Sequence, residues 1–257
     1  MAVSLPGSLE EAVAERVKSA LHGGGFILYG QAIVPLSGGG PQRPFREILI
    51  RFREEEVKML PPGAFFPILQ ENGLLPELDR WVVSALAQRS RAARDENPAV
   101  LLPRNNINLS TETLHDANFV KHVSERVAAA NLPPGTISFE LPWSATVENT
   151  RLVQELMVPL KLAGCDISIA GFDGGPEAFY VVSALRPDFV KLGYGLARNL
   201  SRSLANAEHA EAVNSKCHDL GIQTIAEHVE EQAVLEHLRI IQVDYVQGLI
   251  ISPPEPL

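Results

Sequence analysis

The sequence predicts an α/β fold, a TIM-like (β/α)8 barrel in which one strand runs antiparallel to the others. The chain has 257 residues with 46% apolar content, enough to bury the core of a single barrel domain. Strand-like apolar runs alternate with helix-like segments along most of its length, which is the pattern of a parallel barrel. Two strand-like runs near the start are separated by a turn alone, so they predict an opening hairpin and one antiparallel strand.

The individual elements follow in a regular order. Helical periodicity over residues 9–22 stops at three consecutive glycines, so residues 1–22 are predicted to form an N-terminal helix or linker and residues 23–257 the barrel domain. Strands are predicted at 26–36, 46–52, 100–109, 136–141, 165–170, 188–192, 222–227 and 243–247. Helices are predicted at about 64–72, 76–94, 112–130, 145–163, 176–185, 204–219 and 230–240.

Polar side chains close most of these strands. They are Glu47, Asn108, Glu140, Lys191, Glu227 and Gln247. Because the carboxyl ends of parallel strands meet at the barrel mouth, we expect these side chains to lie together. Their carboxylate and amide oxygens suit Mg²⁺ or Mn²⁺, and the lysine adds a cation for a phosphate or a water. The alternative is that such groups only satisfy one another, and their recurrence at corresponding positions argues against it.

One strand departs from this pattern. The run CDISIA ends at Ala170 and Gly171, neither of which has a side chain able to bind a metal. Any metal site at the mouth would therefore lack ligands from this strand.

Composition excludes several classes of function. The formal net charge of −9 argues against a nucleic-acid partner. Cys165 and Cys217 are far apart and form no CxxC pair, so neither a disulfide framework nor a zinc site is expected. No apolar run approaches the roughly 20 residues that span a bilayer, and the N-terminus lacks a signal-peptide pattern. We expect a cytoplasmic protein, or the cytoplasmic part of a larger one.

Several motifs carry a family resemblance. The opening segments are FILYGQAIVPL, REILIRF and LPPGAFFPILQENGLLPELDRWVV, followed in order by NINLS, FEL, RPDFVKL, TIAEHVEE and VQGLIISPP. Over about residues 23–255 the chain resembles the EAL family of cyclic di-GMP phosphodiesterases, with Glu47-Ile48-Leu49 in place of Glu-Ala-Leu. Such a barrel is expected to bind cyclic di-GMP across its mouth and, in active members, to cut one phosphodiester with two metal ions.

The resemblance also implies roles for individual residues. Glu47, Asn108 and Glu140 look like metal ligands, and Lys191, Glu227 and Gln247 look like remnants of the catalytic groups. The ligand-binding set implied by the resemblance is Gln31, Glu47, Leu49, Arg51, Asn108, Glu140, Asp173 and Gln247. Arg51 is the natural phosphate partner, because a guanidinium offers paired donors to an anionic oxygen.

The departures from the family pattern bear on catalysis. The Asp-Asp-Phe-Gly-x-Gly stretch is here Ala170-Gly171-Phe172-Asp173-Gly174-Gly175, so the aspartate pair is missing and Asp173 is at most a displaced substitute. Gly193 stands where an aspartate is expected, and Trp143 where a glutamate is expected. Without the bridging carboxylates, two cations cannot be held about 3.5 to 4 Å apart, so hydrolysis should be absent or very slow.

The sequence therefore predicts a degenerate EAL domain, a catalytically inactive cyclic di-GMP receptor or signalling module. Two alternatives stay open: a ligand-independent protein-interaction scaffold, and a weak phosphodiesterase using one metal at Glu47, Asn108 and Glu140. No cofactor is required, although Mg²⁺ or Mn²⁺ could occupy the incomplete site. The expected partners are cyclic di-GMP and an unidentified signalling protein, and a homodimer is allowed.

Overall fold

Eight strands close into a ring in the computed structural model, which describes residues 7–36, 43–53, 59–193, 195–196, 200 and 204–257. Around the ring the order is β1, β9, β8, β7, β6, β5, β4 and β2, with β2 pairing again with β1. Their bounds are β1 (Phe26–Pro35), β2 (Phe45–Arg53), β4 (Arg104–Asn108), β5 (Ile137–Pro142), β6 (Asp166–Phe172), β7 (Phe189–Leu192), β8 (Gln223–Ala226) and β9 (Tyr245–Val246). Two short strands, β3 (Met59–Leu60) and β10 (Glu255–Pro256), extend the sheet outside the ring.

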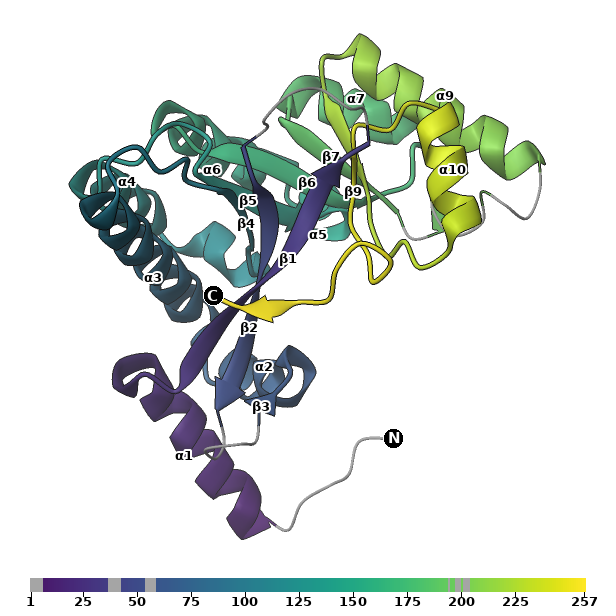
Figure 1. Ribbon diagram of the computed structural model, residues 1–257. Coiled ribbons are helices and arrows are strands. Elements are labelled where there is room, and N and C mark those ends of the chain that lie inside the picture. The colour runs from purple at the N-terminus through teal and green to yellow at the C-terminus, as the bar shows by residue number, and fades with distance from the viewer. Residues whose placement is uncertain (1–6, 37–42, 54–58, 194, 197–199, 201–203) are drawn as a thin grey trace.

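The antiparallel strand is β1, as the sequence predicts. It pairs antiparallel with both of its ring neighbours, β2 and β9, whereas the remaining ring pairs are parallel. The β1–β2 pair is a long hairpin (Figure 1) whose register places Gln31 opposite Glu47. The predicted turn of this hairpin falls mostly on residues 37–42, outside the described part of the chain.

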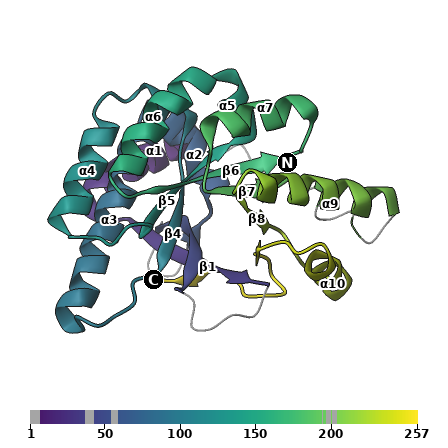
Figure 2. The same ribbon diagram turned by 90° about the horizontal axis from the view of Figure 1, so that it is seen from above.

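Helices surround the ring when the molecule is seen from above (Figure 2). Their bounds are α1 (Gly7–Gly23), α2 (Pro62–Glu71), α3 (Leu75–Glu96), α4 (Phe119–Ala129), α5 (Trp143–Glu148), α6 (Thr150–Leu162), α7 (Pro176–Leu185), α9 (Leu204–Asp219) and α10 (Gln232–Ile240), with a 3-10 helix, η1, at Thr111–His115. The predicted order of strands and helices is therefore confirmed.

Three predicted boundaries need correction. The predicted helix 112–130 is two elements, η1 and α4, because the carboxylate of Asp116 accepts the backbone N–H of Asn118 and pairs with Arg80. The predicted helix 145–163 breaks at Asn149, which has φ −127° and ψ 32°. The predicted strand 100–109 begins only at Arg104, since the preceding Pro103 has no N–H to donate to the sheet.

The amino end of the barrel is closed by aromatic rings. Phe45, Phe189 and Tyr245 pack with ring centroids 5.3 to 6.0 Å apart, and the guanidinium of Arg104 covers two of them. Apolar contacts between strands and helices form the main core outside the ring. The carboxyl end is the one that remains open, so the polar strand-end residues face the mouth.

Helix α1 has its own apolar contacts near one end of the hairpin, beside α2 (Figure 1). Its buried residues Val17, Ala20 and Leu21 belong to the same cluster as Phe26 and Phe65. No helix among the described residues is long and apolar enough to cross a membrane.

Candidate functional site

Lys191 lies at the centre of the polar residues that the sequence singles out. Its side chain is fully buried, and its Nζ lies 2.7 Å from Oε2 of Glu47, 2.8 Å from Oε2 of Glu140 and 3.5 Å from Oε2 of Glu227. The structure thus brings together one lysine and three carboxylates, from β2, β5, β7 and the residue after β8. One ammonium cannot neutralise three carboxylates, so the cluster carries negative charge unless a proton is shared.

Strand register explains this convergence. Asn108 is the β4 partner of Glu140 on β5, and Glu47 on β2 is the partner of Asn106 on β4. Because side chains alternate along a strand, Asn106 and Asn108 both point into the ring. The amide of Asn106 donates to Oε2 of Glu140, one layer below the mouth.

Amide side chains surround Glu47. Nδ2 of Asn108 donates to Oε1 of Glu47 at 2.7 Å, and Nε2 of Gln247 donates to Oε2 at 2.8 Å. Gln247 also donates to Oε1 of Gln31 at 2.9 Å, and Gln31 donates to the carbonyl of Ser252 at 3.0 Å. Both oxygens of Glu47 are therefore occupied by protein donors.

The pKa values of the two buried carboxyls in this cluster are shifted in opposite directions. Burial alone would raise the pKa of Glu47, but the charge of Lys191 and the hydrogen bonds from Lys191, Asn108 and Gln247 lower that pKa to about 2. Burial raises the pKa of Glu140 to about 7 against the opposing charge of Lys191, and the negative charges of Glu47 and Glu227 add to the increase. For Lys191, burial disfavours the charge, yet the three carboxylates raise its pKa. Lys191 and the surrounding amides thus favour the charged form of Glu47, whereas burial and the neighbouring carboxylates favour the protonated form of Glu140.

A cavity of about 480 Å³ opens above this cluster. It is lined by Gln31, Glu47, Leu49, Asn108, Glu140, Glu227, His228, Glu230, Gln247, Gly248, Leu249 and Pro254. Most of the residues proposed from the sequence therefore share one mouth, with Lys191 beneath it.

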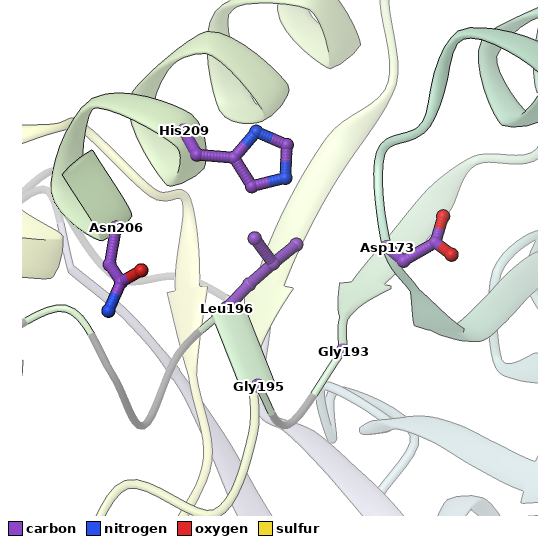
Figure 3. A pocket seen from close by; sticks show the side chains of 6 residues that line it. All are labelled: Asp173, Gly193, Gly195, Leu196, Asn206 and His209. Atoms are coloured by element: carbon purple, nitrogen blue, oxygen red, sulfur yellow. The ribbon is translucent and has the colours of Figure 1, made fainter.

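Two of the proposed ligand contacts lie elsewhere. Arg51 does not line this cavity; its guanidinium donates to the carbonyl of Ile50 at 2.9 Å and lies 5.4 Å from the ring centroid of Tyr29. Asp173 lines a separate pocket of about 300 Å³, together with Leu196 and His209 (Figure 3). The role of Asp173 as a displaced substitute for the missing carboxylates receives no support from this position.

Several residues of the site escape sequence reasoning. Asn106 lies beneath the mouth, and His228, Glu230, Leu249 and Pro254 line it. Alternation in the run NNIN could have identified Asn106, because it is two residues before Asn108. The others lie in loops after strands, where no periodicity indicates the direction of a side chain.

The residues at the end of β6 do not fit a pair of metal ions. Gly171 has φ +76° at an irregularity in the β6–β7 register, and Ala170 supplies no oxygen. A Cβ at Gly193 would lie 3.1 Å from the carbonyl oxygen of Phe172, so an aspartate there has no room without a shift. Trp143 packs edge-on against the ring of Phe172, with centroids 5.3 Å apart. In the ranges that the structure describes, no group of three or more His, Cys, Asp or Glu side chains is arranged to hold a metal ion.

Comparison with known proteins identifies the class of protein. The EAL domain family matches residues 14–254, nearly the whole chain, so the protein belongs to the EAL domain family. The closed barrel with one antiparallel strand is the fold of solved EAL structures. Over 97% of both chains it resembles the Xanthomonas citri FimX EAL domain in complex with c-diGMP, with a TM-score of 0.88 and 24% identity. The Pseudomonas aeruginosa FimX EAL domain bound to c-di-GMP covers 95% of this chain and 96% of its own, with a TM-score of 0.85 and 22% identity.

Two curated relatives are longer proteins. The chain is 29% identical to the cyclic di-GMP phosphodiesterase PdeF of Escherichia coli over 100% of its own length and 34% of that protein. It is 26% identical to the cyclic di-GMP phosphodiesterase PdeB of Shewanella oneidensis, over 95% of this chain and 28% of that protein. The chain thus spans about a third of the length of these relatives.

Proposed function

We propose that this EAL domain binds cyclic di-GMP at the barrel mouth and acts as a signalling receptor without hydrolysing it. One observation carries the proposal: the ammonium of Lys191 lies among the carboxylates of Glu47, Glu140 and Glu227, while β6 ends at Ala170 and Gly171. Carboxylates that could hold a metal ion are thus already paired with a cation of the protein itself.

The hydrogen bonds of Glu47 support the loss of catalysis. Its two oxygens accept from Lys191, Asn108 and Gln247, so binding a divalent cation there would require breaking several of these bonds. Active EAL domains use Mg²⁺ or Mn²⁺, and two cations need bridging oxygens to activate water and stabilise the leaving group. Neither Ala170 nor Gly171 offers one.

Two features support ligand binding. The mouth retains a polar cavity of about 480 Å³ lined by Gln31, Asn108 and Gln247, a size within the usual range of small-molecule sites. The FimX EAL domains that share the fold are described as bound to c-di-GMP. The unidentified protein partner and the homodimer remain predictions.

Incubation of the purified chain with cyclic di-GMP and excess Mn²⁺, followed by chromatography of the nucleotides, tests the proposal. We expect the cyclic ligand to be recovered intact after hours, with a filter-retained fraction bound to protein. Formation of the linear dinucleotide at ~1 per second or faster, the lower end of ordinary enzymes, would identify a phosphodiesterase instead. Intact ligand with none bound would favour a ligand-independent scaffold.

A further inference from the structure

We propose that His228 is a ligand-contacting residue that donates to a phosphate oxygen of the bound cyclic dinucleotide. The inference rests on the proposed function and adds to it a specific group for an anionic ligand. It is carried by the backbone conformation of His228, by the way the chain fixes that conformation, and by the charges around the cavity.

The backbone of His228 adopts a left-handed conformation away from any helix end. Of the described non-glycine residues, four have a positive φ: Asn131, Arg186, His228 and Gln242. The other three stand at or just after the C-terminal ends of α4, α7 and α10, where a left-handed residue commonly ends a helix. His228, at φ 57°, instead follows strand β8 at the barrel mouth. Non-glycine residues that the surrounding structure holds in this conformation cluster at functional sites.

The surrounding chain holds this conformation in place. The N–H of Val229 donates to the carbonyl of Gln247 at 3.0 Å, and the N–H of Gln247 donates to the carbonyl of Ala226 at 2.8 Å. A Cβ at Gly248 would lie 2.0 Å from the carbonyl oxygen of Val229, so only glycine permits this approach. The backbone around His228 is thus fixed, at Ala226 and Val229, against Gln247 and Gly248 after β9, and His228 lines the mouth cavity.

The charges around the cavity favour a basic side chain at the mouth for an anionic ligand. Within the described part of the chain, four carboxyl side chains line the cavity, those of Glu47, Glu140, Glu227 and Glu230, and His228 is the one basic residue among the lining residues. Lys191 lies beneath them, fully buried and engaged by carboxylates. The side chain of His228 is 63% exposed, and its Nε2 lies 4.0 Å from Oε1 of Glu227. A phosphate entering this mouth therefore meets the exposed imidazole of His228 at the rim, beside Glu227.

The two roles of His228 can be separated by substitution. His228→Gly relieves the left-handed conformation, so we expect its Tm to rise by about 2 to 4 °C. The same variant loses the donor, so calorimetric titration with cyclic di-GMP should show affinity reduced roughly 10-fold to 100-fold. His228→Asn, which tolerates the left-handed conformation, should also bind more weakly, which separates loss of the imidazole from gain of backbone freedom. Gln242→Gly is the matched control, because it relieves a residue with φ 61° after α10 and should leave affinity unchanged.

The outcomes separate this inference from the proposed function. Binding by the unaltered chain, with equal or tighter binding by His228→Gly, would overturn the role of His228 and leave the receptor intact. An equal loss in Gln242→Gly would also overturn it, because the effect would not be local. Failure of the unaltered chain and all variants to bind at millimolar ligand would defeat the receptor proposal, and the inference with it.

Discussion

Nζ of Lys191 lies 2.7 Å from Oε2 of Glu47, and this contact joins strands whose residues are 144 positions apart in the chain. It links β7 to β2 through the interior of the ring, beneath the mouth cavity. The pair is therefore both a structural link and the occupant of the centre of the candidate site.

Substitution of Lys191 tests how much this ion pair contributes to the stability of the fold. Lys191→Met keeps much of the buried volume but leaves the carboxylate of Glu47 without its cation, which typically costs about 3 to 5 kcal/mol. Urea unfolding should show this loss in the free energy of unfolding. Lys161→Met is the control, because Lys161 pairs with Asp188 at 3.0 Å near the surface and should cost less than about 1 kcal/mol. Equal effects in the two variants would contradict the account.

The raised pKa of Glu140 predicts a pH dependence of stability. Between its ordinary value of 4.5 and about 7, the folded protein keeps a proton on Glu140 that the unfolded chain releases. The free energy of unfolding therefore falls as the pH rises through this window. Glu47 has the opposite sign but acts between about 2 and 4.5, because its pKa is lowered.

Glu140→Gln should remove the contribution of Glu140 to the pH dependence of stability. Urea unfolding at pH 5, 6, 7 and 8 should show a shallower loss of stability in the variant than in the unaltered protein. Asp79, whose pKa burial raises to about 6, contributes to both proteins alike and cancels in the comparison. Parallel pH profiles would show that Glu140 is already ionised at pH 5.

The backbone conformation of Gly171 makes it costly to restore a carboxylate at this position. No atom of the described residues lies within 4 Å of a Cβ built there, so the obstacle is its φ of +76°, a conformation that costs L-residues roughly 1 to 2 kcal/mol. Thermal unfolding should therefore show a lower Tm for Gly171→Ala, while Gly63→Ala, in open space with no positive φ, serves as the control. An unchanged Tm for Gly171→Ala would mean that the end of β6 adapts freely and could accept an aspartate.

The sequence predicts that Arg51 binds a phosphate of the ligand, and this stays a prediction. It lies on the same alternating face of β2 as Glu47 and Leu49, although outside the cavity lining, so it reaches a ligand only by leaving its contact with Ile50. Arg51→Ala should weaken cyclic di-GMP binding roughly 10-fold to 150-fold in a calorimetric titration. Arg239→Ala, an exposed arginine on α10, should bind like the unaltered protein. Equal affinities of the two variants would remove Arg51 from the site.

The barrel follows from the sequence because local patterns determine it. Buried strands such as TIA at 224–226 read as short apolar runs, and the parallel arrangement places the polar residue that follows at the mouth. The helix breaks at Asp116 and Asn149 did not follow, because apolar periodicity continues across both. The break at Asp116 follows from a side-chain hydrogen bond to the backbone, and the break at Asn149 from a local change of φ and ψ.

The candidate site was predicted less completely. Glu47, Asn108 and Glu140 could be grouped from their strand ends, but their hydrogen bonding around Lys191 depends on side-chain directions that no pattern specifies. The left-handed φ of His228 is likewise invisible in the sequence, since histidine does not require it. Asp173 was placed near the site by its neighbours in the chain, whereas the structure directs it to a separate pocket.

Titration of the unaltered chain with cyclic di-GMP in the presence of EDTA tests the central claim most directly. Because Lys191 already lies among the carboxylates, we predict saturable heat without any divalent cation, and chromatography afterwards should recover only the cyclic ligand. Absence of measurable heat at millimolar ligand, or binding that appears only when Mg²⁺ or Mn²⁺ is supplied, would contradict the account.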